Sequence, residues 1–206
     1  LAVVNKENLR DAVEVMMLFL RKGLVSEAES QSLAILKYFS GHEIAGKVLV
    51  ITRSAAFMTR KIVLTGKDFA RFSDQLKLWK DKSLERLLLG EAFYYLGRAS
   101  ENDELTKEGF YLACPGRYFC TDLVYTFLEK GKNEDAKKMA IYAREKVGTQ
   151  RKAADIKLVM DASLKDGDFG NCYFAFKDLQ QFFPSEINSA VLKSGAYCGE
   201  KQNYIE

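Results

Sequence analysis

The sequence predicts an all-α fold, an α-α superhelix of about five helical hairpins with a C-terminal capping helix, and three observations support this. Apolar residues recur at steps of three and four without period-two alternation, which is typical of amphipathic helices. Only Pro115 and Pro184 interrupt the 206 residues, so long segments are free to be helical. Glycines at the expected turns have a mean spacing of 36 residues, at Gly23, Gly66, Gly97, Gly131 and Gly167. A hairpin of this length cannot bury its apolar face alone, so neighbouring hairpins must stack.

The first two helices are expected over residues 8–22 and 26–39. Asn8 has a side chain suited to an N-cap, and Gly23 ends the first apolar stretch. Ser26 followed three residues later by Glu29 has the spacing of a capping box, which predicts that the second helix begins there.

Residues 43–64 allow two interpretations. Residues 48–51 form a run of Val, Leu, Val and Ile that could be a short buried strand. Ile44, Val48, Ile51, Ala55 and Met58 nevertheless keep the helical period. A lone strand would have no partner, so we predict a helix here, followed after Gly66 by a second helix that begins at Asp68.

The remaining helices follow from turn signals. Helices are expected over residues 83–97 and 100–113, with a turn at residues 114–116, where Cys-Pro-Gly occurs. Residues 118–184 hold two consecutive hairpins that turn at Gly131 and Gly167. A last helix over residues 186–194, ending at Gly195, should cap the array. No Pro/Gly/Ser-rich linker separates the elements, so we predict one domain over residues 1–206. Because the chain opens on Leu1, we expect it to be part of a longer protein.

Composition excludes several functional classes. No apolar run reaches the roughly 18 residues that span a bilayer, so a membrane-spanning role is not expected. The four cysteines form no CxxC pair and His42 is the single histidine, so no metal or other cofactor is predicted. Cys172 falls on an apolar helix face, where free cysteine behaves as a small buried hydrophobe. With no glycosylation sequon in the sequence, these features favour a reducing, cytoplasmic location.

Charge is unevenly distributed along the chain. Residues 47–82 hold nine Lys or Arg against three Asp, whereas the chain after Leu158 holds seven Asp or Glu against four Lys. Aromatic residues interleave with the basic ones, so this segment could bind RNA by holding phosphates and stacking bases. The alternative is that the aromatics are core residues and the basic side chains are solvated.

Parts of the chain resemble the tetratricopeptide repeat. The sequence Leu89-Gly90-x-x-Phe93 is similar to the first helix of that repeat, and Gly167, Phe176 and Pro184 match its turn, aromatic and closing proline. No single repeat carries the full pattern, because Arg71 and Asn102 stand where small residues are usual. The pentatricopeptide family of RNA-binding proteins has nearly the same repeat length and turn pattern.

The resemblance implies a concave groove lined by the first helix of each hairpin, and hence a set of partner-binding residues. These are Arg53, Arg60, Glu91, Tyr94, Thr121, Tyr125, Lys157 and Asp161. Each of them could also be an ordinary solvated residue. Thr121 and Tyr125 do not reproduce the Lys/Asn set with which chaperone-binding members hold a terminal carboxylate, so a chaperone-tail receptor is disfavoured.

We therefore predict a non-catalytic scaffold that binds a peptide or protein partner, acting as an adaptor or complex-assembly subunit. No catalytic residues are assigned, because His42 is about 70 residues from Cys114 and Cys120 and no phosphate-loop or nucleophile motif occurs. The alternatives are a pentatricopeptide-like RNA-binding protein and the peptide-sensing domain of a bacterial regulator.

Overall fold

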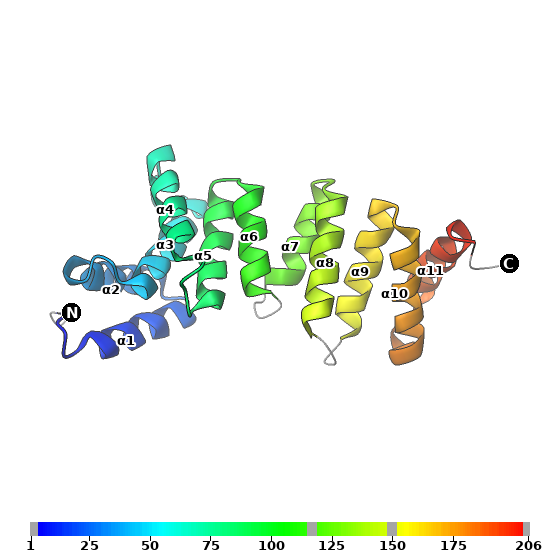
Figure 1. Cartoon of the computed structure of the whole chain (residues 1–206), viewed down its shortest axis with the longest axis horizontal. Helices are drawn as coiled ribbons and strands as arrows, with labels where there is room; N and C mark the ends of the chain where they lie inside the picture. Colours follow the sequence, from blue (N-terminus) through cyan, green and yellow to red (C-terminus); the bar gives the residue numbers. More distant parts are fainter. Residues whose placement is uncertain (1–3, 115–118, 148–151, 204–206) are drawn as a thin grey trace. The chain divides into compact units, whose positions relative to one another are not determined.

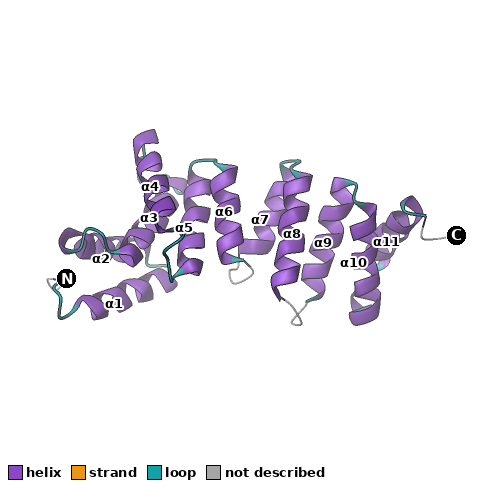
Figure 2. Ribbon diagram, in the orientation of Figure 1, coloured by secondary structure: helices purple, strands orange, loops and turns teal. Residues whose placement is uncertain are grey.

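The computed structural model describes residues 4–114, 119–147 and 152–203. Within these residues the chain is all-α, with helices and no strands, as the sequence predicted (Figure 2). Helix-to-helix contacts divide it into two compact units, Leu1–Ala113 and Cys114–Glu206. The single domain expected over residues 1–206 stays a prediction. Of the expected Cys-Pro-Gly turn, Pro115 and Gly116 lie outside the described residues.

The first unit contains six helices (Figure 1). They are α1 (Leu9–Arg21), α2 (Val25–Tyr38), α3 (Glu43–Met58), α4 (Gly66–Trp79), α5 (Arg86–Ala99) and α6 (Asp103–Ala113). The ambiguous residues 48–51 lie inside α3 and not in a strand. They are helical because α3 packs against both α2 and α5, and helical geometry lets Val48, Val50 and Ile51 all be buried between these two neighbours.

The second unit contains α7 (Phe119–Glu129), α8 (Asn133–Val147), α9 (Ala153–Asp166), α10 (Phe169–Phe182) and α11 (Ser189–Lys201), with a 3-10 turn at Pro184–Glu186. Each α-helix packs against the next one along the chain, and α7 also contacts α9. The helices α9 and α10 run side by side in Figure 1. Consecutive helix pairs of this kind fit the predicted helical superhelix within this unit.

The first helix of each pair ends in the same type of turn. After α1, α3, α5, α7 and α9 one residue adopts a left-handed backbone conformation, and the next N–H donates to the carbonyl five residues earlier at 2.8–3.0 Å. This arrangement is the Schellman motif, which satisfies the last carbonyls of a helix and reverses the chain. The left-handed residues are Gly23, Arg60, Glu101, Gly131 and Gly167.

Three of the five predicted turn glycines are therefore confirmed, and two predictions need correction. Gly66 is the first residue of α4, after the capping residue Thr65. Gly97 lies inside α5, where a side chain would collide with Thr106 of α6. The turns at these two pairs fall on Arg60 and Glu101 instead. A glycine therefore marks either a turn or a close helix contact, and sequence spacing alone did not separate the two cases.

Several helix ends also differ from the predictions. Ser26 does not cap α2, which begins at Val25 directly after the Gly23 turn and has no side-chain cap. The helix expected over residues 43–64 ends at Met58. The last helix begins at Ser189 and runs past Gly195, which is buried where any side chain would collide with the ring of Phe176. Gly195 thus allows close packing of α11 on α10 and does not end the helix.

Glycines bring α5 and α6 into close contact. A Cβ atom added at Gly90 would lie 2.7 Å from the Cβ of Ala113, and one added at Gly109 would lie 2.6 Å from the carbonyl oxygen of Gly90. Both distances are shorter than van der Waals contact, so only glycine allows the two backbones to approach this closely. The Leu-Gly-x-x-Phe segment at residues 89–93 lies at this contact, with Leu89 and Phe93 both buried.

A lysine is fully buried in the first unit. The Nζ atom of Lys47 in α3 donates to the Glu43 carboxylate and to the Ser83 hydroxyl, which lies between α4 and α5. Burial alone would raise the pKa of Glu43, but the hydrogen bonds from Lys47 and Ser83 outweigh it and lower the pKa. A buried charge needs such partners because it has lost its hydration. Lys47 therefore joins α3 to the segment that leads into α5.

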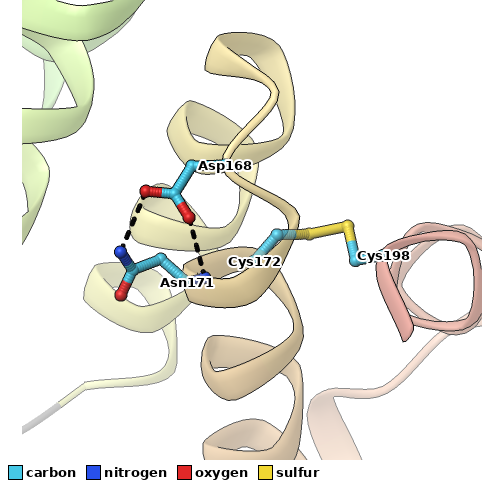
Figure 3. The surroundings of a disulfide bond; sticks show 4 residues. All are labelled: Asp168, Asn171, Cys172 and Cys198. Atoms are coloured by element: carbon cyan, nitrogen blue, oxygen red, sulfur yellow. Dashed lines mark hydrogen bonds between the residues drawn. A yellow bond between two sulfur atoms is a disulfide. The ribbon is translucent and has the colours of Figure 1, made fainter. Parts of the chain in front are cut away.

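The cysteines are not free, which corrects the sequence interpretation. Cys114 is bonded to Cys120, and Cys172 in α10 to Cys198 in α11 (Figure 3). Cys172 is buried as expected, but the sulfur belongs to a disulfide that joins two helices with Cα atoms 6.0 Å apart. The prediction of a cytoplasmic location took the cysteines to be reduced, so it loses this support. Disulfides persist mainly in oxidising compartments.

Glu101→Gly should stabilise the first unit by about 0.5–1 kcal/mol, because a left-handed conformation strains any residue with a Cβ atom. Gly23→Ala is the matched control and should cost about 1 kcal/mol, since the position is also left-handed but faces open space. Urea unfolding followed by the fluorescence of Trp79, the one tryptophan of the sequence, measures both changes. A loss of stability in Glu101→Gly would contradict the turn assignment.

Glu43→Gln should destabilise the first unit by about 2 kcal/mol, because it leaves the buried ammonium of Lys47 without its carboxylate. The same substitution in a Lys47→Met background should have little effect, since no buried charge remains there. Trp79 packs against Gly46, next to Lys47, so its fluorescence in urea unfolding is a suitable signal. Equal losses in the two backgrounds would show that the ion pair does not stabilise the unit.

Candidate binding surface on α7 and α9

The predicted partner-binding residues of the second unit lie on two helices that contact each other. Thr121 and Tyr125 are one turn apart on α7, and Lys157 and Asp161 are one turn apart on α9. The hydroxyl of Tyr125 donates to Oδ2 of Asp161 at 3.3 Å. The structure thus brings Tyr125 and Asp161 together, as a groove lined by the first helices requires.

A hollow of about 300 Å³ lies beside this hydrogen bond. Its six lining residues form three pairs, each with one residue on α7 and one on α9, and the members of each pair are 36 residues apart. They are Tyr125 with Asp161, Leu128 with Leu164, and Glu129 with Lys165. The turn glycines Gly131 and Gly167 have the same separation. The hollow is therefore built from equivalent positions of two consecutive hairpins.

Sequence reasoning missed four residues of this hollow. The set that the tetratricopeptide resemblance implies does not include Leu128, Glu129, Leu164 or Lys165. In the structure both leucines are only partly buried and contribute apolar walls. The signal that would have found them is the 36-residue offset, because it maps each residue near the end of α7 onto its equivalent on α9.

Burial sets the protonation chemistry of this site. Burial raises the pKa of Asp161, and the opposing effects of the Tyr125 hydrogen bond and of Lys157 and Lys165 are smaller. The pKa of Tyr125 is also raised, first by burial and then by the negative charge of Asp161. The ammonium of Lys157 is bonded to Oε2 of Glu186 at 2.7 Å. Asp161 is thus a carboxylate that has lost part of its hydration at the wall of an open hollow.

Lys137 fixes the hairpin next to this site. Its Nζ atom in α8 lies 2.6 Å from Oδ2 of Asp166 and 3.0 Å from Oδ2 of Asp168. Hydrogen bonds to both carboxylates raise the pKa of Lys137. Asp168 also caps α10 by accepting from the backbone N–H of Asn171 at 3.1 Å (Figure 3). Asp166 and Asp168, which flank Gly167, therefore hold the α9–α10 turn against α8.

The predicted site residues of the first unit lie on α3, its turn and α5. Nε of Arg53 in α3 contacts Oε1 of Glu29 in α2 at 2.6 Å, so its charge is used in holding the two helices together. Arg60 is the left-handed residue that follows α3. Glu91 and Tyr94 are half-buried on α5, where the Tyr94 ring meets that of Tyr95.

The aromatic side chains of the basic segment 47–82 pack against other parts of the first unit. Phe72 is buried, the rings of Phe57 and Phe69 pack on each other at 5.3 Å, and Trp79 lies against Gly46. Four of the nine basic residues contact acidic residues of this unit, namely Lys47, Arg53, Arg71 and Lys80. Phe72 belongs to the core, and Phe57, Phe69 and Trp79 are partly buried side chains packed against it.

Neither nucleophile considered in the sequence carries a free thiol. Cys114 and Cys120 are bonded to each other, and Nδ1 of His42 accepts from the backbone N–H of Ala45 at 3.3 Å, which caps α3. In the part of the chain that is described, no group of three or more His, Cys, Asp or Glu residues is placed to hold a metal ion. None of the described helices is long and apolar enough to cross a membrane.

Comparisons with models of protein families, with curated proteins and with solved structures found no match to this chain. The candidate site therefore depends on its own geometry. Two consecutive hairpins present equivalent residues on one surface, and a partly buried carboxylate, a tyrosine and two leucines meet at a hollow there.

Asp161→Asn should stabilise the second unit at neutral pH. The native state binds a proton at Asp161 more tightly than the unfolded chain does, because the pKa is raised from its ordinary value of 3.8. The contribution of Asp161 to the free energy of unfolding is therefore most favourable at low pH. It is lost as the pH rises through the pKa that Asp161 has in the native state. The gain of the asparagine variant should be present at pH 7 and disappear near pH 3.8 and below.

Urea unfolding followed by circular dichroism, with amide exchange of α9 as the local signal, measures this difference. Asp155→Asn on the same helix is the matched control, because Asp155 lies in the first turn of α9 and outside the hollow. A gain in Asp161→Asn that is as large at pH 3.5 as at pH 7 would show that its charge is not the cause.

Proposed function

We propose that this chain is a non-catalytic helical-repeat protein, similar to the tetratricopeptide class, that binds an extended segment of a protein partner across α7 and α9. The observation that carries this proposal is the pairing of equivalent residues, 36 apart, around one hollow. A surface that repeats from hairpin to hairpin suits a ligand that runs past successive helices, as an extended peptide does. Such a protein would act as an adaptor or complex-assembly subunit.

The hollow has the composition of a recognition site. Its size is at the lower end of small-ligand pockets, which suits one side chain of a peptide. Apolar walls from Leu128 and Leu164 offer burial, and Tyr125 and Asp161 offer directed hydrogen bonds. Tyr125 retains 40% of its surface exposed, and tyrosine is among the residues that most often dominate binding energy at interfaces.

RNA binding, the alternative function, is supported less well. It would depend on aromatic and basic side chains of residues 47–82. The aromatics there are buried in the core or packed against it, and several of the basic groups contact acidic residues. A peptide-sensing role in a bacterial regulator would use the same surface of α7 and α9, so it is a more specific form of the function proposed here.

Leu164→Ala should weaken the binding of peptide ligands about tenfold. The substitution removes apolar surface from the hollow, worth roughly 1–2 kcal/mol of binding free energy. Ligands can be obtained by selecting random twelve-residue peptides on the intact, oxidised chain, and their affinities measured by calorimetry. Methyl shifts of Leu128 and Leu164 in nuclear magnetic resonance spectra locate the bound peptide.

Leu192→Ala is the matched control, since Leu192 is an exposed leucine of α11 in the same unit and does not line the hollow. It should leave the affinity unchanged. Selected peptides that bind both variants as tightly as the parent chain, without shifting the two leucines, would contradict the proposed function.

A further inference from the structure

The hollow on α7 and α9 supports a further inference about the chemistry of its ligand, which rests on the proposed function. Three of the lining side chains are formally charged, namely Glu129, Asp161 and Lys165. Two carboxylates against one ammonium leave one net negative charge. The charge of Lys157 also acts on Asp161, but the carboxylate of Glu186, which is bonded to the Lys157 ammonium, offsets that charge. The hollow thus favours a cationic group.

Asp161 is the more buried of the two carboxylates in the hollow, because Glu129 is exposed to solvent. It is partly buried, and burial is the main cause of its raised pKa. Its hydrogen bond from the Tyr125 hydroxyl measures 3.3 Å, which is long for an O–H···O bond. A carboxylate has about four acceptor positions, so Asp161 can accept further donors. A ligand that donated hydrogen bonds to Asp161 would replace those that the carboxylate lost when it was partly buried.

The apolar side chains that line the hollow favour a weakly hydrated cation over a strongly hydrated one. Leu128, Leu164 and the ring of Tyr125 form an apolar surface around the carboxylate. An ammonium group is strongly hydrated and loses much of that hydration in such surroundings, whereas a guanidinium is planar, weakly hydrated and able to stack on an aromatic ring. A guanidinium can also give two parallel hydrogen bonds to one carboxylate.

We propose that the hollow binds an arginine side chain of the partner peptide. Its guanidinium pairs with the carboxylate of Asp161 beside the Tyr125 ring, and its methylene groups lie against Leu128 and Leu164. Glu129 and Lys165, at equivalent positions on α7 and α9, carry opposite charges and offset each other. A volume of about 300 Å³ accommodates one long side chain.

The test compares three pentapeptides, Gly-Ala-X-Ala-Gly with both ends blocked, in which X is arginine, citrulline or lysine. Citrulline has the shape of arginine but no charge. Titration into the intact chain, followed by the methyl shifts of Leu128 and Leu164, gives the three affinities. The arginine peptide should bind at least tenfold more tightly than the citrulline peptide, and more tightly than the lysine peptide.

Two variants separate the charge of Asp161 from other effects. Asp161→Asn should weaken the arginine peptide at least tenfold and leave the citrulline peptide unchanged. Asp155→Asn removes the same charge from the same helix outside the hollow and should change neither affinity. Because Asp161→Asn is expected to stabilise the fold, loss of binding in it cannot be attributed to unfolding.

Equal binding of the arginine and citrulline peptides, or of the arginine and lysine peptides, would overturn the guanidinium assignment while leaving a peptide-binding hollow in place. An unchanged affinity of Asp161→Asn for the arginine peptide would overturn the role of Asp161. Failure of all three pentapeptides, together with failure to select any peptide that shifts Leu128 and Leu164, would instead refute the proposed function.

Discussion

The left-handed residue that follows α1, α3, α5, α7 and α9 is the constraint on which the local architecture depends. After α1, α5, α7 and α9 the next helix begins within two or three residues, whereas a longer segment separates α3 from α4. The accompanying hydrogen bond satisfies a helix-end carbonyl that would otherwise lack a partner. The reversal places the next helix alongside the first, so that their apolar faces can be buried together. Arg60 and Glu101 adopt this conformation at an energetic cost, because both carry a Cβ atom.

Different contacts hold the helices of the two units together. In the first unit, Gly90, Gly97 and Gly109 let α5 and α6 approach closely, and the buried Lys47 bonds to Glu43 and Ser83. In the second unit, a disulfide joins α10 to α11, and Lys137 links α8 to the acids that flank Gly167. In the same unit, α7 packs against α8 and also contacts α9.

The candidate site is a consequence of this repetition. Two hairpins of the same length present the same positions on one surface, so that residues 36 apart in the sequence become neighbours in space. Asp161 is partly desolvated there, which costs folding free energy at neutral pH. Such a cost is typical of a group that serves a purpose other than stability, and a cationic ligand would offset it.

The sequence by itself determined the helical class and three of the five turn residues. These follow from local rules, because helical periodicity and the left-handed preference of glycine act over a few residues. Tertiary structure decided the roles of Gly97 and Gly195. Both lie inside helices, at positions where a side chain would collide with Thr106 or Phe176 of the neighbouring helix. It also decided that Cys172 pairs with Cys198 and that Leu128 and Leu164 line a hollow. Such roles depend on residues distant in the sequence, and local periodicity holds no information about which distant residues come into contact.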